Sequence, residues 1–192
     1  MGKVLFNISV SLDGFVESPV DGVARLFRWY FSGDTEVRFS DSLTFKVSAA
    51  SAHLFQAAWP KIGAMITGRR NFDISHAWGG NPPLGIPHVV VTHRVPQDWA
   101  YEGSPFHFVA GDIASAVAQA KQLAGDKDVA ISTPSVMQQC LKAGLLDEIS
   151  LDLVPILLGA GTPVFQDTPA DLKPISVVEG TGVTHLRYGV IK

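Results

Sequence analysis

Residues 64–70 read Ala-Met-Ile-Thr-Gly-Arg-Arg, an apolar run that ends in a threonine, a glycine and two arginines. The apolar part predicts a short buried strand, and the glycine after it allows another backbone to approach closely. Residues 88–92 and 128–131 have the same form, a short apolar run followed by polar residues. We interpret all three as buried strands with polar carboxyl ends. These ends are Thr67-Gly68-Arg69-Arg70, Thr92-His93-Arg94 and Ser132-Thr133-Pro134-Ser135.

The rest of the chain alternates helical and extended patterns around these three strands. The period-two pattern from Lys3 to Leu12 predicts a strand with an apolar face that includes Ile8 and Leu12. Residues 18–35 contain several aromatic residues and read as a loop. We expect helices over 48–59, over 113–124 with Asp112 as the cap, and from Thr133 as N-cap to near Gly144. Further strands are expected over 106–109, 149–157 and 181–191.

This element order predicts a single α/β domain over residues 1–192. Helices between short buried strands favour a sheet covered on both faces, hence three layers, α/β/α. The last strands follow one another without a helix, so we expect a mixed sheet that is antiparallel at its C-terminal edge.

Composition excludes several classes of protein. With 46% hydrophobic and 17% charged residues, the chain of 192 residues can bury a large core. Its net charge of −3 argues against a nucleic-acid partner, and its single cysteine excludes an intrachain disulfide. We also expect no membrane span, no secretory signal, no metal site among the six histidines, and a cytoplasmic location.

The polar strand ends point to an anionic ligand. In open α/β sheets, ligands bind outside the carboxyl ends of the strands, where helix N-termini and arginines attract phosphate groups. Three such ends indicate an elongated ligand with more than one phosphate. The sequence has no Gly-x-Ser-x-Gly elbow and no phosphate loop ending in Gly-Lys-Ser or Gly-Lys-Thr, which argues against a hydrolase or a nucleoside triphosphatase.

Four segments together resemble a known family. They are Ser9–Gly14, Gly63–Asp73, Val89–Arg94, and the run from Ala143 through Pro155–Gly161 to Phe165. In order and spacing they are similar to the dihydrofolate reductase-like proteins, grouped with the reductase domain of bifunctional riboflavin-biosynthesis enzymes. The resemblance covers nearly the whole chain and implies a dihydrofolate reductase-like fold.

The resemblance also implies NADPH as the cofactor and a homodimer as the assembly. It assigns the phosphate side of the cofactor to Gly68, Arg69 and Arg70, and the 2′-phosphate to Thr92, His93 and Arg94. The implied pyrophosphate contacts are Ile131, Ser132, Thr133, Ser135 and Val136. Ile8, Ser9, Asp13 and Trp29 would border the nicotinamide and the substrate, although ordinary strand packing explains the first-strand residues equally well.

The sequence departs from this family where members usually carry Gly-Gly and this chain has Ser132-Thr133. Two glycines let the backbone come close to a pyrophosphate, whereas two side chains occupy that space. Either the hydroxyls replace some backbone contacts and NADPH still binds, or the cofactor site is closed.

A catalytic acid is not identified by any motif. Asp34 and Glu36 lie roughly where dihydrofolate reductases place such a carboxylate, but solvated loop carboxylates explain them as well. Two functions therefore stay open. The first is an NADPH-dependent reductase of a pteridine- or pyrimidine-like small molecule, similar to dihydrofolate reductase or 5-amino-6-(5-phosphoribosylamino)uracil reductase. The second is a catalytically silent relative that binds a nucleotide or small ligand, or acts as a dimeric scaffold.

Overall fold

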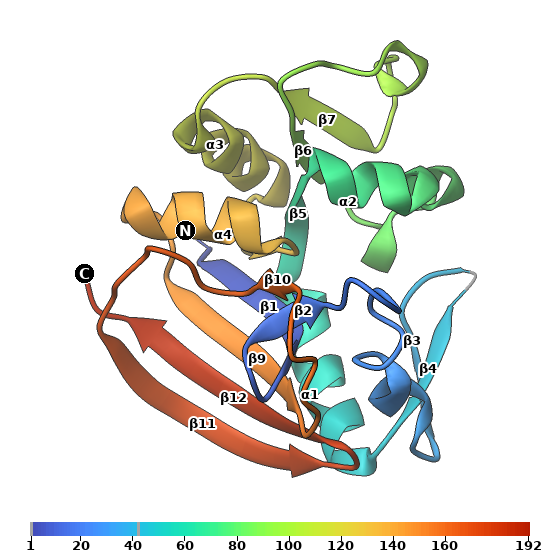
Figure 1. Ribbon diagram of the computed structural model, residues 1–192. Helices are drawn as coiled ribbons and strands as arrows, with labels where there is room; N and C mark the ends of the chain where they lie inside the picture. The colour runs from blue at the N-terminus through green and yellow to red at the C-terminus, as the bar shows by residue number, and fades with distance from the viewer. Residues whose placement is uncertain (1, 42) are drawn as a thin grey trace. The chain divides into compact units, whose positions relative to one another are not determined.

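A computed structural model describes residues 2–41 and 43–192 of the chain (Figure 1). The chain divides into two compact units. The first consists of Met1–Phe6 and Trp59–Asp147, and the second of Asn7–Ala58 and Glu148–Lys192. Each unit is described separately below.

The first unit is built on parallel strands. They are β5 (Ile62–Gly68), β6 (His88–Val91), β7 (Phe106–Val109) and β8 (Asp128–Ile131), with the start of β1 (Val4–Ser11) paired to β8. Almost every residue in the middle of β5, β6 and β8 is buried, as expected for parallel strands covered on both faces. All of these strands were predicted from the sequence.

Helices cover the strands of the first unit from two sides. In Figure 1, α2 (Arg69–Ile74) lies on one side of β5, and α3 (Ile113–Ala124) and α4 (Pro134–Lys142) lie on the other. The predicted cap of α3 is confirmed, because Asp112 Oδ1 accepts a hydrogen bond of 2.7 Å from the amide of Ser115. The sequence analysis missed α2, a six-residue helix that is too short to show an amphipathic repeat. Short 3-10 helices complete the unit as η2 (Trp59–Lys61), η3 (His76–Gly80), η4 (Pro83–Gly85) and η5 (Gln97–Trp99).

The second unit contains the antiparallel strands β9 (Glu148–Val154), β12 (Val183–Val190) and β11 (Leu172–Gly180), paired in that order. The antiparallel C-terminal edge is therefore confirmed. The strand β11 was missed, because it is an edge strand exposed on both faces and shows no strict apolar alternation. The remaining elements are β2 (Phe15–Glu17), η1 (Arg28–Phe31), β3 (Thr35–Arg38), β4 (Thr44–Val47), α1 (Ala49–Ala58) and β10 (Thr162–Pro163).

The expected apolar face of the first strand is confirmed as far as Val10, which is 2% exposed, but is wrong at Leu12. Leu12 follows the end of β1 and is 63% exposed, while Ser9 and Ser11 are buried. Both serines are accommodated because their hydroxyls are hydrogen-bonded: Ser9 Oγ accepts from Trp29 Nε1, and Ser11 Oγ donates to Asp13. The sequence pattern does not show these partners.

Among the described residues, one sheet has eight strands in the order β11-β12-β9-β1-β8-β5-β6-β7. It is parallel from β1 to β7 and antiparallel at β11, β12 and β9, so the expected mixed sheet is confirmed. No helix in the described part of the chain is long and apolar enough to cross a membrane.

Candidate cofactor and substrate sites

The polar ends of β8, β5 and β6 emerge at one edge of the first unit. The three strands are parallel neighbours, with Ile66 of β5 opposite both Val89 and Ile131. The residues that follow each strand therefore lie next to one another, as the sequence predicted. This edge is where open α/β sheets bind ligands.

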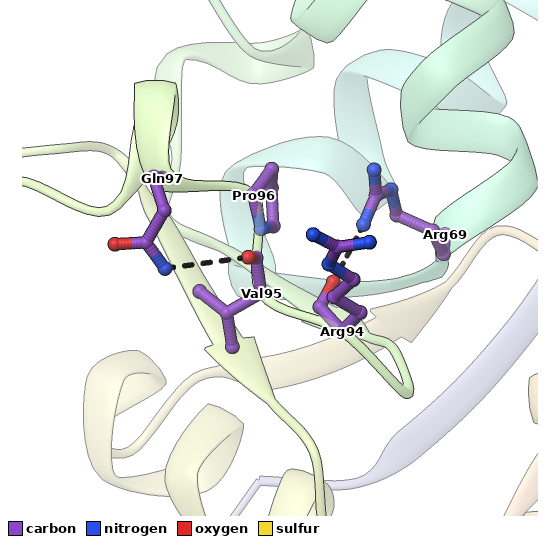
Figure 2. A pocket seen from close by; sticks show the side chains of 5 residues that line it. All are labelled: Arg69, Arg94, Val95, Pro96 and Gln97. Carbon is purple, nitrogen blue, oxygen red and sulfur yellow. Dashed lines mark hydrogen bonds between the residues drawn. The ribbon is translucent and has the colours of Figure 1, made fainter.

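A cavity of about 480 Å³ opens beside this edge and is lined by Arg69, Arg94, Val95, Pro96 and Gln97 (Figure 2). The guanidinium of Arg69 is held in place, because its Nε donates to Asp73 at 2.7 Å and its Nη1 donates to the carbonyl of Arg94 at 2.6 Å. Thr92 Oγ1 donates to the same carbonyl at 2.8 Å.

The cavity carries an uncompensated positive charge. Asp73 neutralises Arg69, but no carboxylate of the described residues pairs with the guanidinium of Arg94. An arginine that is free to bind and stands beside a second, fixed arginine is suited to a phosphate group. The structure thus brings together three of the predicted residues, namely Arg69, Thr92 and Arg94.

Arg70 and His93, also predicted to hold the cofactor, have a different environment. Both are exposed, and neither is among the described residues that line the cavity. Each is adjacent in the chain to a cavity arginine. A contact of these two side chains with a phosphate in the cavity would therefore require them to reorient.

The Ser132-Thr133 pair lies where β8 leads into α4. Thr133 occupies the N-cap position of α4, as predicted, although its side chain makes no capping hydrogen bond. Instead Thr133 Oγ1 accepts a hydrogen bond of 3.1 Å from the amide of Gly68, across the strand ends. A Cβ at Gly68 would lie 3.3 Å from that oxygen and 3.6 Å from Ser135 Oγ, so Gly68 allows this close approach. The side chains of Ile131 and Val136 are buried in the core.

The predicted substrate residues belong to the second unit, and two of them, Ser9 and Trp29, are hydrogen-bonded to each other. Trp29 Nε1 donates to Ser9 Oγ at 3.1 Å, and both residues are buried. Ile8 is half-buried on β1. Tyr30 is stacked between the rings of Trp29 and Phe45, at centroid distances of 4.0 and 4.3 Å. Trp29 is therefore part of a packed aromatic cluster.

Asp13 is an anchor between two loops. Its carboxylate accepts hydrogen bonds from the hydroxyl of Ser11 and from the amides of Leu158 and Gly159. The Ser11 bond, together with these amides, lowers the pKa of Asp13 to about 2. The carboxylate is thus ionised at neutral pH and is not suited to donating a proton.

Asp34 and Glu36, the predicted candidates for a catalytic acid, are exposed at the start of the β3–β4 hairpin. Glu36 pairs with Lys46 at 3.4 Å, and Asp34 accepts from the hydroxyl of Thr35 at 3.2 Å. Both environments are typical of solvated surface carboxylates.

Sequence analysis missed a buried polar chain in the second unit. Ser51 Oγ lies 2.8 Å from His185 Nε2, and His185 Nδ1 donates to Asp152 Oδ1 at 2.7 Å. Ser51 and His185 are 134 residues apart in the sequence, and His185 and Asp152 are 33 apart, so no local motif marks these residues. One signal was present: Asp152 is the only charged residue of the expected strand over 149–157, and carboxylates are rarely buried without a partner. The described residues contain no group of three or more side chains placed to hold a metal ion.

The strand order and helix placement define a dihydrofolate reductase-like fold. The chain belongs to the RibD C-terminal domain family, whose model matches residues 2–186. A putative riboflavin biosynthesis protein from Shewanella sp. PV-4 has a similar structure, with a TM-score of 0.72, 22% identity and complete coverage of both chains.

Two further solved structures share the fold. The riboflavin biosynthesis reductase of Saccharomyces cerevisiae has a TM-score of 0.66 and 11% identity, covering 99% of this chain and 90% of its own. A dihydrofolate reductase from Enterococcus faecalis, complexed with NADP(H), has a TM-score of 0.62 and 12% identity, covering 100% and 98%. No curated protein matches the chain.

Proposed function

We propose that this protein is an NADPH-dependent reductase of a pyrimidine- or pteridine-like small molecule. Membership of the RibD C-terminal domain family supports a pyrimidine reductase-like role. The observation that carries the proposal is the cavity with two arginines at the carboxyl edge of β5 and β6. When bound, NADPH supplies the hydride, and the protein supplies orientation and electrostatics.

The cavity fits the 2′-phosphate that distinguishes NADPH from NADH. Arg94 would bind this phosphate, and Arg69 would add a second positive charge from a position fixed by Asp73. Thr92 holds the loop that carries Arg94, because its hydroxyl bonds both the carbonyl and the amide of Arg94. We extend the proposal to Arg70 and His93, two exposed side chains that are adjacent in the chain to the cavity arginines Arg69 and Arg94.

The residues at the start of α4 can bind a pyrophosphate if the Thr133 hydroxyl replaces the Gly68 amide as a hydrogen-bond donor. Thr133 Oγ1 accepts a hydrogen bond from the Gly68 amide, so this amide is no longer available to a ligand. The Thr133 hydroxyl keeps its own hydrogen, for which the described residues provide no acceptor. The hydroxyl can therefore donate to a phosphate oxygen in place of the amide. The N-terminal turn of α4, with Ser135 exposed on it, adds further donors and a favourable dipole.

For the substrate, we propose that Ser9 and Trp29 form a rigid wall, because both are buried and hydrogen-bonded to each other. We propose that half-buried Ile8 borders the substrate from the opposite face of β1, and that Asp13 fixes the adjoining loop through its bonds to the amides of Leu158 and Gly159. Asp34 and Glu36 lack the burial that would suit a carboxylate to proton transfer.

The test is a titration with NADPH and with NADH, followed by the fluorescence of the four tryptophans. We expect saturable binding that favours NADPH. Replacing Arg94 by alanine removes a charge-assisted bond worth about 1.5–3 kcal/mol, so NADPH affinity should fall about 10- to 150-fold. NADH affinity should stay constant, and Arg28→Ala, a change of an exposed arginine in the second unit, should alter neither.

The silent-relative alternative rests on Ser132-Thr133 and makes a different prediction for the same titration. If these side chains close the site, the native protein binds neither nucleotide, and the double change Ser132→Gly with Thr133→Gly restores binding. If the hydroxyl replaces the amide as proposed, the native protein binds, and the double change alters affinity only modestly.

We also propose that the protein forms a homodimer through β11. Ile175 and Val177 of this edge strand are large apolar residues that are 48% and 63% exposed. Light scattering should give twice the chain mass of 20.6 kDa, and Val177→Lys should shift the particle towards that single-chain mass. Because the proposed reaction draws on NADPH, we keep the cytoplasm as the expected compartment.

A further inference from the structure

Trp99 is not among the described residues that line the cavity of the first unit, but it connects the two segments that do. The first segment is the cavity loop, residues 94–99, which carries Arg94 and ends in η5. The second is α2, which begins with Arg69 (Figure 2). The indole of Trp99 meets the ring of Phe72 on α2 edge-on, with ring centroids 6.2 Å apart. Trp99 therefore packs the loop that carries one cavity arginine against the helix that carries the other.

The contact belongs to a larger group of rings, the α2 aromatic cluster. Its members are Phe72, Phe106 and the partly buried Trp78, Trp99 and Phe108. Phe72 and Phe106 are almost completely buried, and Trp99 meets the Phe106 ring edge-on at 5.4 Å. Edge-to-face pairs of buried rings stabilise a contact beyond the area that they bury. The cluster therefore anchors the end of the cavity loop.

A strained turn completes the cluster beside Trp99. Residues His76–Gly79 have φ angles between 48° and 62°, a left-handed conformation that L-residues rarely adopt in succession. The turn places the Trp78 ring against Phe106. It is followed by Gly80, where a Cβ would lie 3.5 Å from the indole of Trp99. Strain of this kind persists only where the surrounding packing holds it. Trp99 is thus held by contacts from α2, from β7 and from the end of this turn.

The other end of the cavity loop is held by hydrogen bonds. Arg69 Nη1 and Thr92 Oγ1 both donate to the carbonyl of Arg94, and Thr92 Oγ1 also accepts from its amide. Between the two ends, Pro96 fixes one backbone angle, and its carbonyl accepts from the amide of Trp99 at 3.4 Å. The loop therefore has little freedom to move Arg94 away from Arg69.

This restriction matters for a phosphate. A guanidinium presents its N–H donors in a rigid plane, so two arginines bind one phosphate well only at a suitable separation. Arg94 is exposed and has no carboxylate partner among the described residues, so its loop, and not an ion pair, determines its position. A mobile loop would have to be ordered on binding, which lowers affinity.

We propose that Trp99 is a positioning residue that sets the separation of Arg69 and Arg94 and thereby favours NADPH over NADH. This inference rests on the proposed function, which gives Arg94 the 2′-phosphate as its ligand. Trp99 acts by holding the cavity loop in the conformation that binds this phosphate. NADH has no 2′-phosphate and gains nothing from that conformation. Trp99 therefore affects the ratio of the two affinities.

The first experiment measures the affinities for NADPH and NADH. Binding is followed by the emission of the reduced nicotinamide, because removing a tryptophan changes the fluorescence of the protein itself. We expect Trp99→Leu to lower NADPH affinity about 10-fold, the equivalent of ordering the backbone of about one residue on binding, and to leave NADH affinity unchanged. Trp99→Phe keeps a ring in the α2 aromatic cluster and should retain most of the selectivity. An unchanged ratio of affinities in Trp99→Leu overturns the proposal.

Phe108→Leu is the matched control. Phe108 packs on Phe72 at 5.4 Å in the same cluster but lies on β7, outside the cavity loop. This change should destabilise the protein in urea unfolding and keep the selectivity for NADPH. An equal loss of selectivity in Phe108→Leu and Trp99→Leu overturns the proposal, because general loosening of the cluster would then explain both.

The second experiment tests whether Trp99 acts through Arg94. In the Arg94→Ala background, Trp99→Leu should cause no further loss of selectivity, whereas independent effects would multiply. A multiplied loss overturns the proposal.

Asp98 offers a variant that leaves the α2 aromatic cluster intact. It is exposed in the cavity loop and is not among the described residues that line the cavity. We expect Asp98→Gly to be about 2- to 5-fold less selective for NADPH than Asp98→Ala, which removes the same charge without freeing the backbone. Equal selectivity of the two variants overturns the proposal and leaves the proposed function intact. A wild-type protein that binds no NADPH overturns the proposed function, and the role of Trp99 with it.

Discussion

Acid should destabilise the first unit through one histidine, His88 at the start of β6. His88 is fully buried, and its Nδ1–H donates to the carbonyl of Ile86 at 2.9 Å. Its Nε2 has no hydrogen-bond partner among the described residues, and the imidazole ring packs beside the rings of Trp78 and Phe106. Burial lowers the pKa of His88 from 6.5 to about 4, because a charged ring there would be neither solvated nor paired.

The direction and size of the effect follow from this shift. The unfolded chain takes up a proton at His88 below about pH 6.5, and the folded chain does so only below about pH 4. Between these values acid favours the unfolded chain, so stability falls as the pH is lowered and falls no further once both states are protonated. The shift corresponds to at most about 3 kcal/mol.

Urea unfolding at several pH values measures this loss. The wild-type free energy of unfolding should drop between pH 6.5 and pH 4 by about 3 kcal/mol more than that of His88→Leu, which has no proton to bind there. His53→Gln, a change of an exposed histidine, should follow the wild type. Parallel curves for the wild type and His88→Leu would show that the burial argument is wrong.

Two further predictions concern the second unit. Asp13→Asn should loosen the loop that its carboxylate holds, so the amides of Leu158 and Gly159 should exchange hydrogen faster, while exchange in β5 stays constant; unchanged exchange at these amides would contradict the anchor role. Gly180→Ala should destabilise the protein by about 1–3 kcal/mol in urea unfolding, because the new Cβ would meet Ser51 Oγ at 2.5 Å. Gly111→Ala, whose Cβ would have no neighbour closer than 3.8 Å, is the matched control, and equal effects of the two changes would refute the close contact.

The parallel part of the sheet could be predicted from the sequence because each strand is covered on both faces. A strand of this kind has to be apolar throughout, so β5, β6 and β8 appear as short apolar runs whose polar ends stand out. Adjacent parallel strands then bring their carboxyl ends together, and Arg69, Thr92 and Arg94 meet without any long-range information. The placement of these cofactor candidates follows from topology alone.

The second unit was harder to predict because its polar groups are matched by partners that are distant in sequence. Ser9 is buried because Trp29 donates to it, and Asp152 is buried because His185 lies across the strand pair. The apolar periodicity of a strand predicts that each such polar residue is exposed, or that the strand ends there. Burial of a polar side chain depends on its partner, and a single sequence does not identify the partner.

The side chain of Thr133 decides between the two candidate functions, an NADPH-dependent reductase and a catalytically silent relative. An amide at Gly68 that faced a ligand would present a fixed donor, whereas the Thr133 hydroxyl, once it has accepted that amide, presents a donor that can rotate. A rotating donor can follow a phosphate oxygen, but its orientation has to be fixed on binding. This entropic cost is small beside a charge-assisted bond to Arg94. If the protein binds NADPH as proposed, Ser132 and Thr133, at the place where the family resemblance implies Gly-Gly, should therefore weaken the pyrophosphate contacts without abolishing recognition of the 2′-phosphate. The selectivity for NADPH over NADH should then survive even where total affinity is low.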